Sequence, residues 1–258
     1  MKLIDTHCHL YLPEFDSDRN DVIHRAQESG VDKFFLPNID SSSVNSMLLL
    51  SAANSGICYP MMGLHPGSVK DDWLREITII EKYLFNTTGL KFYGIGETGL
   101  DGYWDKSYVH KQKENFQRHI GWAKELHLPI TIHSREATEE CIALIKENKD
   151  ENLTGIFHCF TGTIEQAHEI ADMDFYLGIG GVVTFKNAGL DKVLEQIDLE
   201  HIVLETDSPY LAPVPYRGKR NETSYLKLIV SKIAVIKNLP LEEVASITTR
   251  NAMRVFQL

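Results

Sequence analysis

The chain of 258 residues is 43% apolar and 24% charged, a composition that excludes a disordered protein and leaves enough apolar residues for a sizeable core. Its formal net charge of -10 argues against a protein that coats nucleic acid through its whole surface, because such binding needs many lysine and arginine contacts with phosphate. No stretch approaches the roughly 18 apolar residues of a membrane span, and the apolar run at the start is too short for a secretory signal, so we expect a cytoplasmic protein.

Short β-rich runs alternate with amphipathic stretches along the whole chain. In chain order, strands are predicted at residues 2–5, 32–38, 58–66, 91–97, 129–134, 154–160, 174–180 and 201–207. The predicted helices include residues 17–29, 41–54, 109–126, 136–148, 163–171, 222–237 and 241–256. Eight such units without a linker fit a (β/α)8 TIM barrel, as a single domain over residues 1–258, better than an open doubly wound sheet. The absence of a GxGxxG turn after the first strand also weakens a dinucleotide-binding fold.

Most of the predicted strands end in a side chain that can bind a metal or move a proton. In chain order these are His7, His9, His65, Glu97, His133, His158 and Asp207. In a parallel barrel the carboxyl ends of the strands converge on one mouth, where barrel enzymes carry out chemistry, so this pattern indicates one site. A lone histidine is more often a hydrogen-bonded core or surface residue than a ligand, and we apply that interpretation to the histidines on predicted helices: His24, His110, His119, His127 and His168.

Strand geometry refines the roles of the first histidines and of the cysteines. Residues two apart on a strand share a face, so His7 and His9 project together and can bind one metal, while Cys8 points toward the helix layer. By the same rule Cys159 turns away from His158, and both thiols are predicted to be packing residues. The four cysteines are widely spaced and form no CxxC pair, so we expect no disulfides.

Imidazole nitrogens and carboxylate oxygens suit divalent ions such as zinc, magnesium, manganese or iron, and a carboxylate can bridge two ions. The predicted ligands are His7, His9, Glu97, His133, His158 and Asp207. Six ligands are about enough for two ions with open coordination positions, which indicates catalysis. A pair of ions can activate a water and stabilise the attacking and leaving oxygens of a phosphoester. Glu205 shares a strand face with Asp207 and is a candidate for orienting a ligand or handling a proton.

With these residues the chain resembles the TatD family of metal-dependent hydrolases, the TatD-like deoxyribonucleases of the amidohydrolase superfamily. The resemblance covers essentially the whole length and rests on ordered motifs: DTHCHL, GLHP, GIGETGLD, PITIHSREA, FHCFTG, LETDSPYLAP and RGKRN. It implies a TIM barrel, a divalent-metal site on the same six residues, and nuclease activity on DNA, including removal of nucleotides from 3′ ends. Two positions depart from many relatives, namely Gly102 before the aromatic pair and Thr223 where proline is common. Both are predicted to lie in mouth loops, where they bear on the substrate.

We therefore expect a deoxyribonuclease, 3′-5′ exonuclease-like, that cleaves single-stranded DNA or 3′ ends with a metal-activated water. Asp207 is predicted to accept the proton of the attacking water, and Glu97 to bridge or border the ions. The predicted substrate contacts are His65, Arg135, Arg217, Asn221 and Tyr103, with Trp104, Lys219 and Arg220 nearby. For the aromatic pair the alternative is core packing, and for the cationic residues of the 217–221 loop it is a solvated surface.

Two other functions are compatible with the same residues. One is an amidohydrolase-type enzyme that acts on a small amide or lactone. Several such enzymes bridge their ions with a carboxylated lysine at the fourth strand, whereas this chain has Glu97 there, which favours the phosphodiesterase. The other is a metal-binding interaction protein without turnover. The sequence is compatible with a monomer, and the mixed donor set leaves zinc, magnesium and manganese open.

Overall fold

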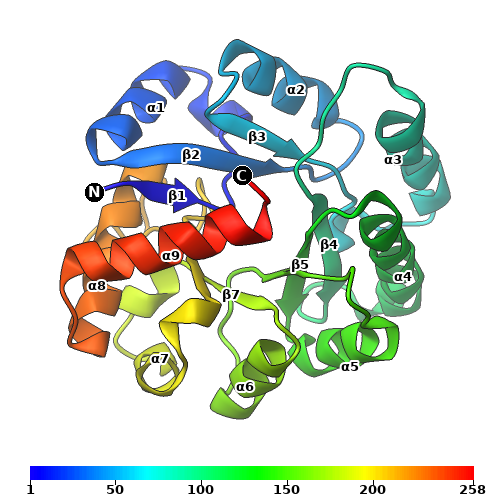
Figure 1. Ribbon diagram of the computed structural model, residues 1–258. Helices are drawn as coiled ribbons and strands as arrows, with labels where there is room; N and C mark the ends of the chain where they lie inside the picture. The colour runs from blue at the N-terminus through cyan, green and yellow to red at the C-terminus, as the bar shows by residue number, and fades with distance from the viewer.

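Eight parallel strands alternate with helices in the computed structural model, which describes residues 1–258, and they form a (β/α)8 barrel with helices around it (Figure 1). The strands are β1 Leu3–Asp5, β2 Val31–Pro37, β3 Cys58–Met61, β4 Ile95–Asp101, β5 Ile130–Arg135, β6 Gly155–Phe157, β7 Tyr176–Ile179 and β8 Ile202–Leu204. Each one overlaps a run predicted from the sequence, so the predicted barrel is confirmed. The strands pair in the order β1-β2-β3 and β4-β5-β6-β7-β8.

Two seams join these groups of strands into a barrel. At the first seam Met62, just after β3, forms a parallel bridge with Ile95 of β4. At the second seam the backbone N–H and the hydroxyl of Thr6 both donate to the carbonyl of Leu204, each at 3.0 Å. The ends of β1 and β8 therefore lie side by side, which brings the first and last motifs of the chain together.

Seven of the nine helices match the stretches predicted from the sequence. The nine are α1 Arg19–Glu28, α2 Val44–Ala53, α3 Trp73–Asn86, α4 Val109–Leu126, α5 Thr138–Asn148, α6 Ile164–Asp172, α7 Leu190–Gln196, α8 Leu226–Lys237 and α9 Leu241–Val255. Helices α3 and α7 have no named counterpart among the predicted stretches. The predicted 222–237 helix divides into a short 3-10 helix, Thr223–Tyr225, followed by α8. None of the helices combines the length and the apolar character that crossing a membrane requires.

The apolar core lies on both sides of the strands. A large cluster fills the space between strands and outer helices, and a smaller one fills the inside of the barrel. Helix α9 closes the smaller cluster from the amino ends of the strands: Phe256 stacks on Phe35 of β2 with ring centroids 3.5 Å apart, and Thr249 donates to the carbonyl of Lys2. The carboxyl ends of the strands are thereby left for polar side chains.

Strand β4 lies further along the chain than predicted. It begins at Ile95 rather than at residue 91, and it ends at Asp101 rather than at Glu97. The apolar pattern breaks at Glu97, but β5 pairs with β4 as far as Asp101, opposite Arg135, and every residue of β4 is buried. Glu97 therefore lies within β4, and Asp101 takes the position at the strand end.

Candidate active site

His7 and His9 follow β1, and the side chain of Asp5 fixes them relative to the end of β8. The Asp5 carboxylate accepts hydrogen bonds from the backbone N–H of His7 at 3.3 Å and from the N–H and hydroxyl of Thr206 at 3.0 and 2.6 Å. Asp207 then donates its backbone N–H to the carbonyl of His7 at 2.9 Å. The Nε2 atoms of His7 and His9 lie together as predicted, 3.2 Å apart, although both residues follow β1, which ends at Asp5.

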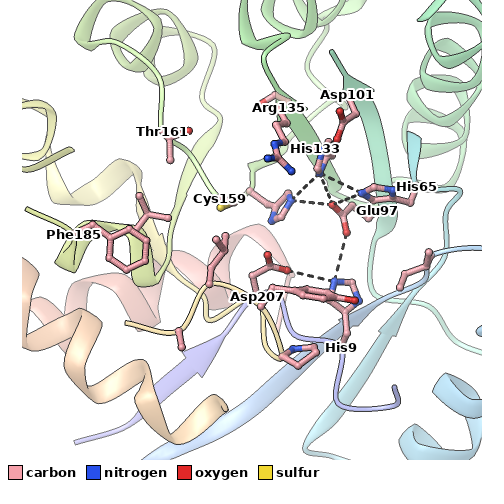
Figure 2. Close-up of a pocket in the computed structure, with 18 of the residues that line it drawn as sticks. His9, His65, Glu97, Asp101, His133, Arg135, Cys159, Thr161, Phe185 and Asp207 are labelled. Atoms are coloured by element: carbon pink, nitrogen blue, oxygen red, sulfur yellow. Dashed lines mark hydrogen bonds and ion pairs between the residues drawn. The ribbon is translucent and has the colours of Figure 1, made fainter. Parts of the chain in front are cut away.

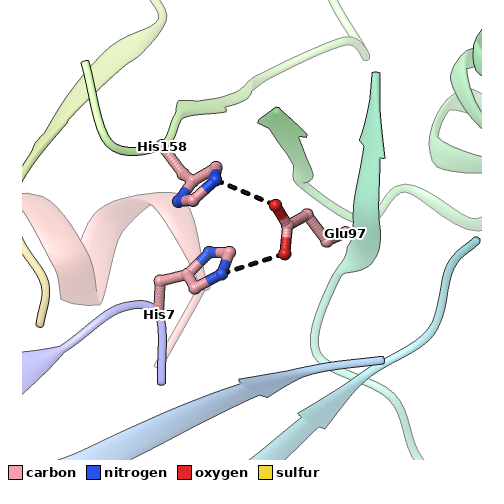
Figure 3. A group of neighbouring side chains, drawn as sticks. All are labelled: His7, Glu97 and His158. Carbon is pink, nitrogen blue, oxygen red and sulfur yellow. Dashed lines mark ion pairs between the residues drawn. The ribbon is translucent and has the colours of Figure 1, made fainter. Parts of the chain in front are cut away.

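The carboxylate of Glu97 is the centre of the polar cluster (Figure 2). Its Oε2 faces Nε2 of His7 at 3.1 Å and of His9 at 3.6 Å. Its Oε1 faces Nδ1 of His133 and Nε2 of His158, both at 2.9 Å. Figure 3 shows how His7 and His158 each meet a different oxygen of Glu97. Burial alone would raise the pKa of Glu97, but the surrounding histidines hold it well below its usual range.

Asp101 orients His133. Its Oδ2 accepts a hydrogen bond from Nε2 of His133 at 3.0 Å, which leaves the lone pair of Nδ1 directed at the cluster. Its Oδ1 accepts hydrogen bonds from the backbone N–H groups of Tyr103 and Trp104 at 2.9 and 3.2 Å. Burial would raise the pKa of Asp101, but these hydrogen bonds hold it at about 2. One carboxylate thus connects a candidate ligand with the loop after β4.

His158 follows β6 and is supported from behind by Glu205. Its Nδ1 lies 3.4 Å from Oε1 of Glu205, and the same oxygen accepts the backbone N–H of Cys159 at 2.6 Å. Its ring stacks on that of His7, with centroids 3.9 Å apart. Burial alone would lower the pKa of His158, but Glu97 and Glu205 raise it well above its usual range. Glu205 therefore contacts a candidate ligand, the orienting position predicted for it, although it follows β8, which ends at Leu204.

Asp207 lies between the cluster and solvent. Its Oδ1 is 3.5 Å from Nε2 of His9 and 3.7 Å from Nε2 of His7. The backbone has φ 55°, a left-handed conformation that aspartate tolerates better than most residues. The side chain is 13% exposed, against 3% for Glu97. Burial would raise the pKa of Asp207, but the histidines lower it. This carboxylate can therefore meet both the cluster and a substrate.

The converging atoms fit a divalent cation. Three overlapping sets of side chains bring possible ligand atoms within 4.8 Å of one another: His7, Glu97 and His158; His7, His9 and Asp207; and His65, Glu97 and His133. Glu97 and Asp207 are buried, and all their ion-pair partners are imidazoles. Because buried carboxylates need a compensating cation, and imidazole with carboxylate is a common donor set, the residues suit a metal. The six predicted ligands all lie here, joined by His65.

A pocket of about 940 Å³ opens over this cluster at the carboxyl ends of the strands. Arg135, Arg217 and Lys219 line it. None of the three forms an ion pair, although carboxylates lie in the same pocket. The arginines that form ion pairs with carboxylates are Arg19, Arg25, Arg220 and Arg250. The guanidinium of Arg217 lies 4.5 Å from the ring centroid of Phe185. Figure 2 shows Phe185 on the side of the pocket opposite His65.

Comparison with known proteins decides the family. A profile described as TatD related DNase matches residues 4–257. The chain belongs to this family. It is 41% identical to an uncharacterized metal-dependent hydrolase, YabD of Bacillus subtilis, over 99% of each chain. It is 34% identical to another, YcfH of Escherichia coli, over 100% of this chain and 97% of YcfH. The structure of the TatD homologue YjjV from Escherichia coli matches with a TM-score of 0.91 at 25% identity, covering 99% of this chain and 98% of that one.

The cationic loop of this TatD-family chain divides between pocket and scaffold. Arg217 and Lys219 line the pocket, and both side chains are exposed to solvent, so the structure is compatible with the predicted substrate contact and with the solvated-surface alternative. Arg220 instead forms two hydrogen bonds of 2.7 Å with the carboxylate of Asp18. The positive charge of Arg220 is thereby neutralised by Asp18, so Arg220 is not a candidate for substrate binding.

Asn221 does not occupy the position predicted for a substrate contact. It is fully buried, and its amide group donates to the carbonyls of Thr206 and Tyr210 at 2.7 and 2.6 Å. Its side-chain oxygen accepts the backbone N–H of Glu222 at 2.9 Å. Because both N–H groups are used, Asn221 has no donor left for phosphate. It anchors the loop next to the end of β8 instead.

The aromatic pair after β4 also differs from the prediction. Tyr103 and Trp104 are 47% and 74% exposed, so core packing is wrong for both. The ring of Tyr103 lies 3.7 Å from the guanidinium of Arg135, and Trp104, not Tyr103, lines the pocket. The glycine at position 102 has a steric explanation, since a Cβ there would lie 2.7 Å from the carbonyl oxygen of Glu136. The loop therefore depends on a glycine that permits close approach.

Two further predictions need correction. Cys159 lines the pocket rather than packing in the core, because β6 ends at Phe157 and alternation no longer applies at a residue with φ 47°. Burial raises the pKa of its thiol well above the usual range. Thr223, expected in a mouth loop, is fully buried and does not line the pocket. Cys8 is buried and all four cysteines are free, as predicted.

The strand-end pattern missed Asp5 and Asp101, which hold candidate ligands in place through hydrogen bonds. Both are acidic residues inside the family motifs, close in sequence to candidate ligands, and this was the available signal. The helix histidines agree with their structural interpretation. His119 is buried, its Nε2 accepts the N–H of Leu64 at 3.0 Å and its Nδ1 pairs with the carbonyl of Asn115 at 2.8 Å, while His24, His110, His127 and His168 are exposed.

Proposed function

We propose that the protein is a metal-dependent hydrolase that cleaves DNA phosphodiester bonds and removes nucleotides from single strands as a 3′-5′ exonuclease. The observation that carries this proposal is the presence of Arg135, Arg217 and Lys219, free of ion pairs, in the pocket that contains the imidazole and carboxylate cluster. Cations without an ion-pair partner suit an anionic substrate, and the arginine fork matches phosphate. The TatD-related DNase family supports DNA as that substrate.

The candidate ligands divide into two groups around Glu97, which supports two divalent ions of zinc, magnesium or manganese. His7 and His9 face one oxygen of Glu97, and His133 and His158 face the other. Asp207 would complete the first group, and His65 is available to the second. Bound ions would lower the pKa of a water molecule and stabilise negative charge on the phosphoryl oxygens.

The residues of the chain would orient the reactants and move the proton. Three carboxylates near the histidines line the pocket, and Asp207 is the most exposed of them, at 13% against 3% for Glu97 and 4% for Asp101, so it would accept the proton of the attacking water. Arg135 and Arg217 would hold the phosphate from two walls of the pocket. Asp101 and Glu205 would keep His133 and His158 in the correct orientation through their hydrogen bonds and ion pairs.

Digestion of single-stranded oligonucleotides labelled at the 3′ or the 5′ end tests the proposal. We expect stepwise release from the 3′ end that requires a divalent ion and stops with a chelator. Asp207→Asn and Glu97→Ala should lower kcat at least about 100-fold, because loss of a positioned acid or base typically costs that much. Asp172→Asn, which changes an exposed carboxylate on α6, is the matched control and should keep full activity.

Other outcomes identify the remaining functions. Full DNA cleavage by both site variants would overturn the proposed mechanism. Hydrolysis of a small amide or lactone, with no turnover of oligonucleotides or of bis-p-nitrophenyl phosphate, would identify an amidohydrolase-type enzyme. Tight metal binding without turnover of any of these substrates would identify a metal-binding interaction protein.

A further inference from the structure

Trp104 is an aromatic ring that the fold leaves uncovered at the edge of the pocket. It is 74% exposed, whereas the other two tryptophans, Trp73 and Trp122, are 4% and 7% exposed. It also lines the pocket that contains the polar cluster. Burying this ring would be favourable, since a buried aromatic side chain removes a large apolar area from water. The position therefore calls for a ligand with a flat apolar face.

The backbone that carries Trp104 is held in place before any ligand arrives. Its N–H and that of Tyr103 donate to the buried carboxylate of Asp101. The neighbouring Gly102 donates to the carbonyl of Arg135 at 2.8 Å. The rings of Tyr103 and Trp104 meet edge to face, with centroids 4.9 Å apart. A platform built in this way loses little conformational freedom when it binds a ligand.

A positive charge lies next to the exposed ring. The guanidinium of Arg135 lies 3.7 Å from the ring centroid of Tyr103 and 5.5 Å from that of Trp104. Arg135 forms no ion pair, and it follows His133 of the cluster by two residues on β5. Figure 2 shows Arg135 beside His133. A ligand that satisfies both groups has an aromatic face and, next to it, an anionic group that reaches the cluster.

We propose that Trp104 is the stacking platform for the base of the nucleotide next to the cleaved phosphate, and that Arg135 binds the phosphate of that nucleotide. This inference rests on the proposed function, because it assigns a base-binding position within the same pocket. Stacking is tolerant of base identity, since every base has an aromatic face, so the platform favours single-stranded DNA without selecting a sequence. Tyr103 has a different role, which is to hold Arg135 through its ring.

Binding of two matched oligomers tests the platform. The probes are a hexathymidylate with phosphorothioate linkages, which resist hydrolysis, and a phosphorothioate oligomer of equal length that lacks all bases. Binding to the full-length protein is followed by tryptophan emission, which responds chiefly through Trp104 because the other tryptophans are buried. Anisotropy of a fluorescein-labelled probe measures Kd for variants without Trp104.

We expect Trp104→Ala to raise the Kd for hexathymidylate about 5- to 150-fold, as stacking of one base predicts, and to leave the Kd of the baseless oligomer unchanged. Trp104→Phe should retain most of the affinity, because it keeps an aromatic face. Val235→Ala is the control, since Val235 is 76% exposed and lies on α8 outside the pocket lining. It should change neither Kd.

Three binding results would each overturn the platform: an unchanged Kd for hexathymidylate in Trp104→Ala, an equal loss of affinity for both oligomers, or tryptophan emission that changes with protein concentration but not with oligonucleotide. The last result would show that Trp104 contacts a second copy of the chain. Failure of the proposed function is separate, because a protein that does not cleave DNA can still bind hexathymidylate through Trp104. Conversely, normal DNA cleavage with an unchanged KM in Trp104→Ala would reject the platform alone.

Discussion

Replacement of Asp101 by asparagine changes one atom of the side chain that orients His133. The oxygen that accepts the N–H groups of Tyr103 and Trp104 is kept if the new NH2 group faces Nε2 of His133. An NH2 group cannot accept a hydrogen bond, so the histidine proton must move to Nδ1. That nitrogen faces Glu97 at 2.9 Å and would then lack the lone pair that a metal needs. In the opposite amide orientation, the NH2 group faces the backbone N–H groups of Tyr103 and Trp104. Donors then face donors, and these two hydrogen bonds are lost.

The expected cost follows from either orientation. Loss of the carboxylate partner of a ligating histidine typically lowers metal affinity by about 10- to 100-fold, or roughly 1.4 to 2.7 kcal/mol. We therefore expect Asp101→Asn to raise the Kd of the ion on the His133 side of Glu97 by about 10- to 100-fold. The ion on the side of His7 and His9 should change little, because Asp101 contacts neither histidine.

Titration of the metal-free protein with zinc and with manganese, in competition with a chelating dye, measures both affinities. Circular dichroism confirms that the variant is folded. Asp105→Asn is the matched control, because Asp105 is an exposed acid in the same loop, where it caps the N–H of Ser107. A folded Asp101→Asn protein that binds both ions as tightly as the wild type would refute the role given to Asp101.

Other predictions concern residues that support the site. Burial lowers the pKa of His119 to about 4, so the unfolded chain takes up a proton first, and this group lowers stability by up to about 3 kcal/mol as pH drops from about 6.5 to 4. In urea unfolding, His119→Gln should show a smaller fall in stability over this range than the wild type, and an unchanged pH profile would contradict the assignment. Gly102→Ala should shift the emission of Trp104 and weaken hexathymidylate binding, because the new Cβ would clash with the carbonyl oxygen of Glu136. Emission and affinity equal to those of the wild type would argue against that clash. Asn221→Ala should lower the unfolding free energy by roughly 2 kcal/mol or more, because it leaves the buried carbonyls of Thr206 and Tyr210 without these hydrogen bonds. A loss below about 0.5 kcal/mol in thermal unfolding would refute the anchoring role.

Local patterns predicted the barrel well because its elements are short and regular. Apolar runs followed by polar residues identified all eight strands, and the helix Val109–Leu126 was predicted at its observed ends. The sequence also predicted which ligands would meet, because parallel strands in a barrel must bring their carboxyl ends to one mouth. His7 and Asp207 thus come together although they lie 200 residues apart.

Contacts between loops could not be predicted in this way. Arg217 and Arg220 are close in sequence, yet one faces the pocket and the other binds Asp18, whose distance from the loop is set by the closure of the barrel. The same holds for Asn221, whose burial depends on carbonyls at the end of β8. Beyond a strand end, side-chain alternation stops, which is why Cys159 entered the pocket against expectation.

The barrel, the side chains of the polar cluster and the family could all be predicted from the sequence. The three-dimensional structure was needed to show that Glu97 lies between two groups of histidines, that Asp101 orients His133, and that Trp104 is exposed beside Arg135. The physical reason is that periodicity records which face of an element is apolar. The direction of a polar side chain beyond the strand depends on hydrogen-bond partners that come from distant parts of the chain.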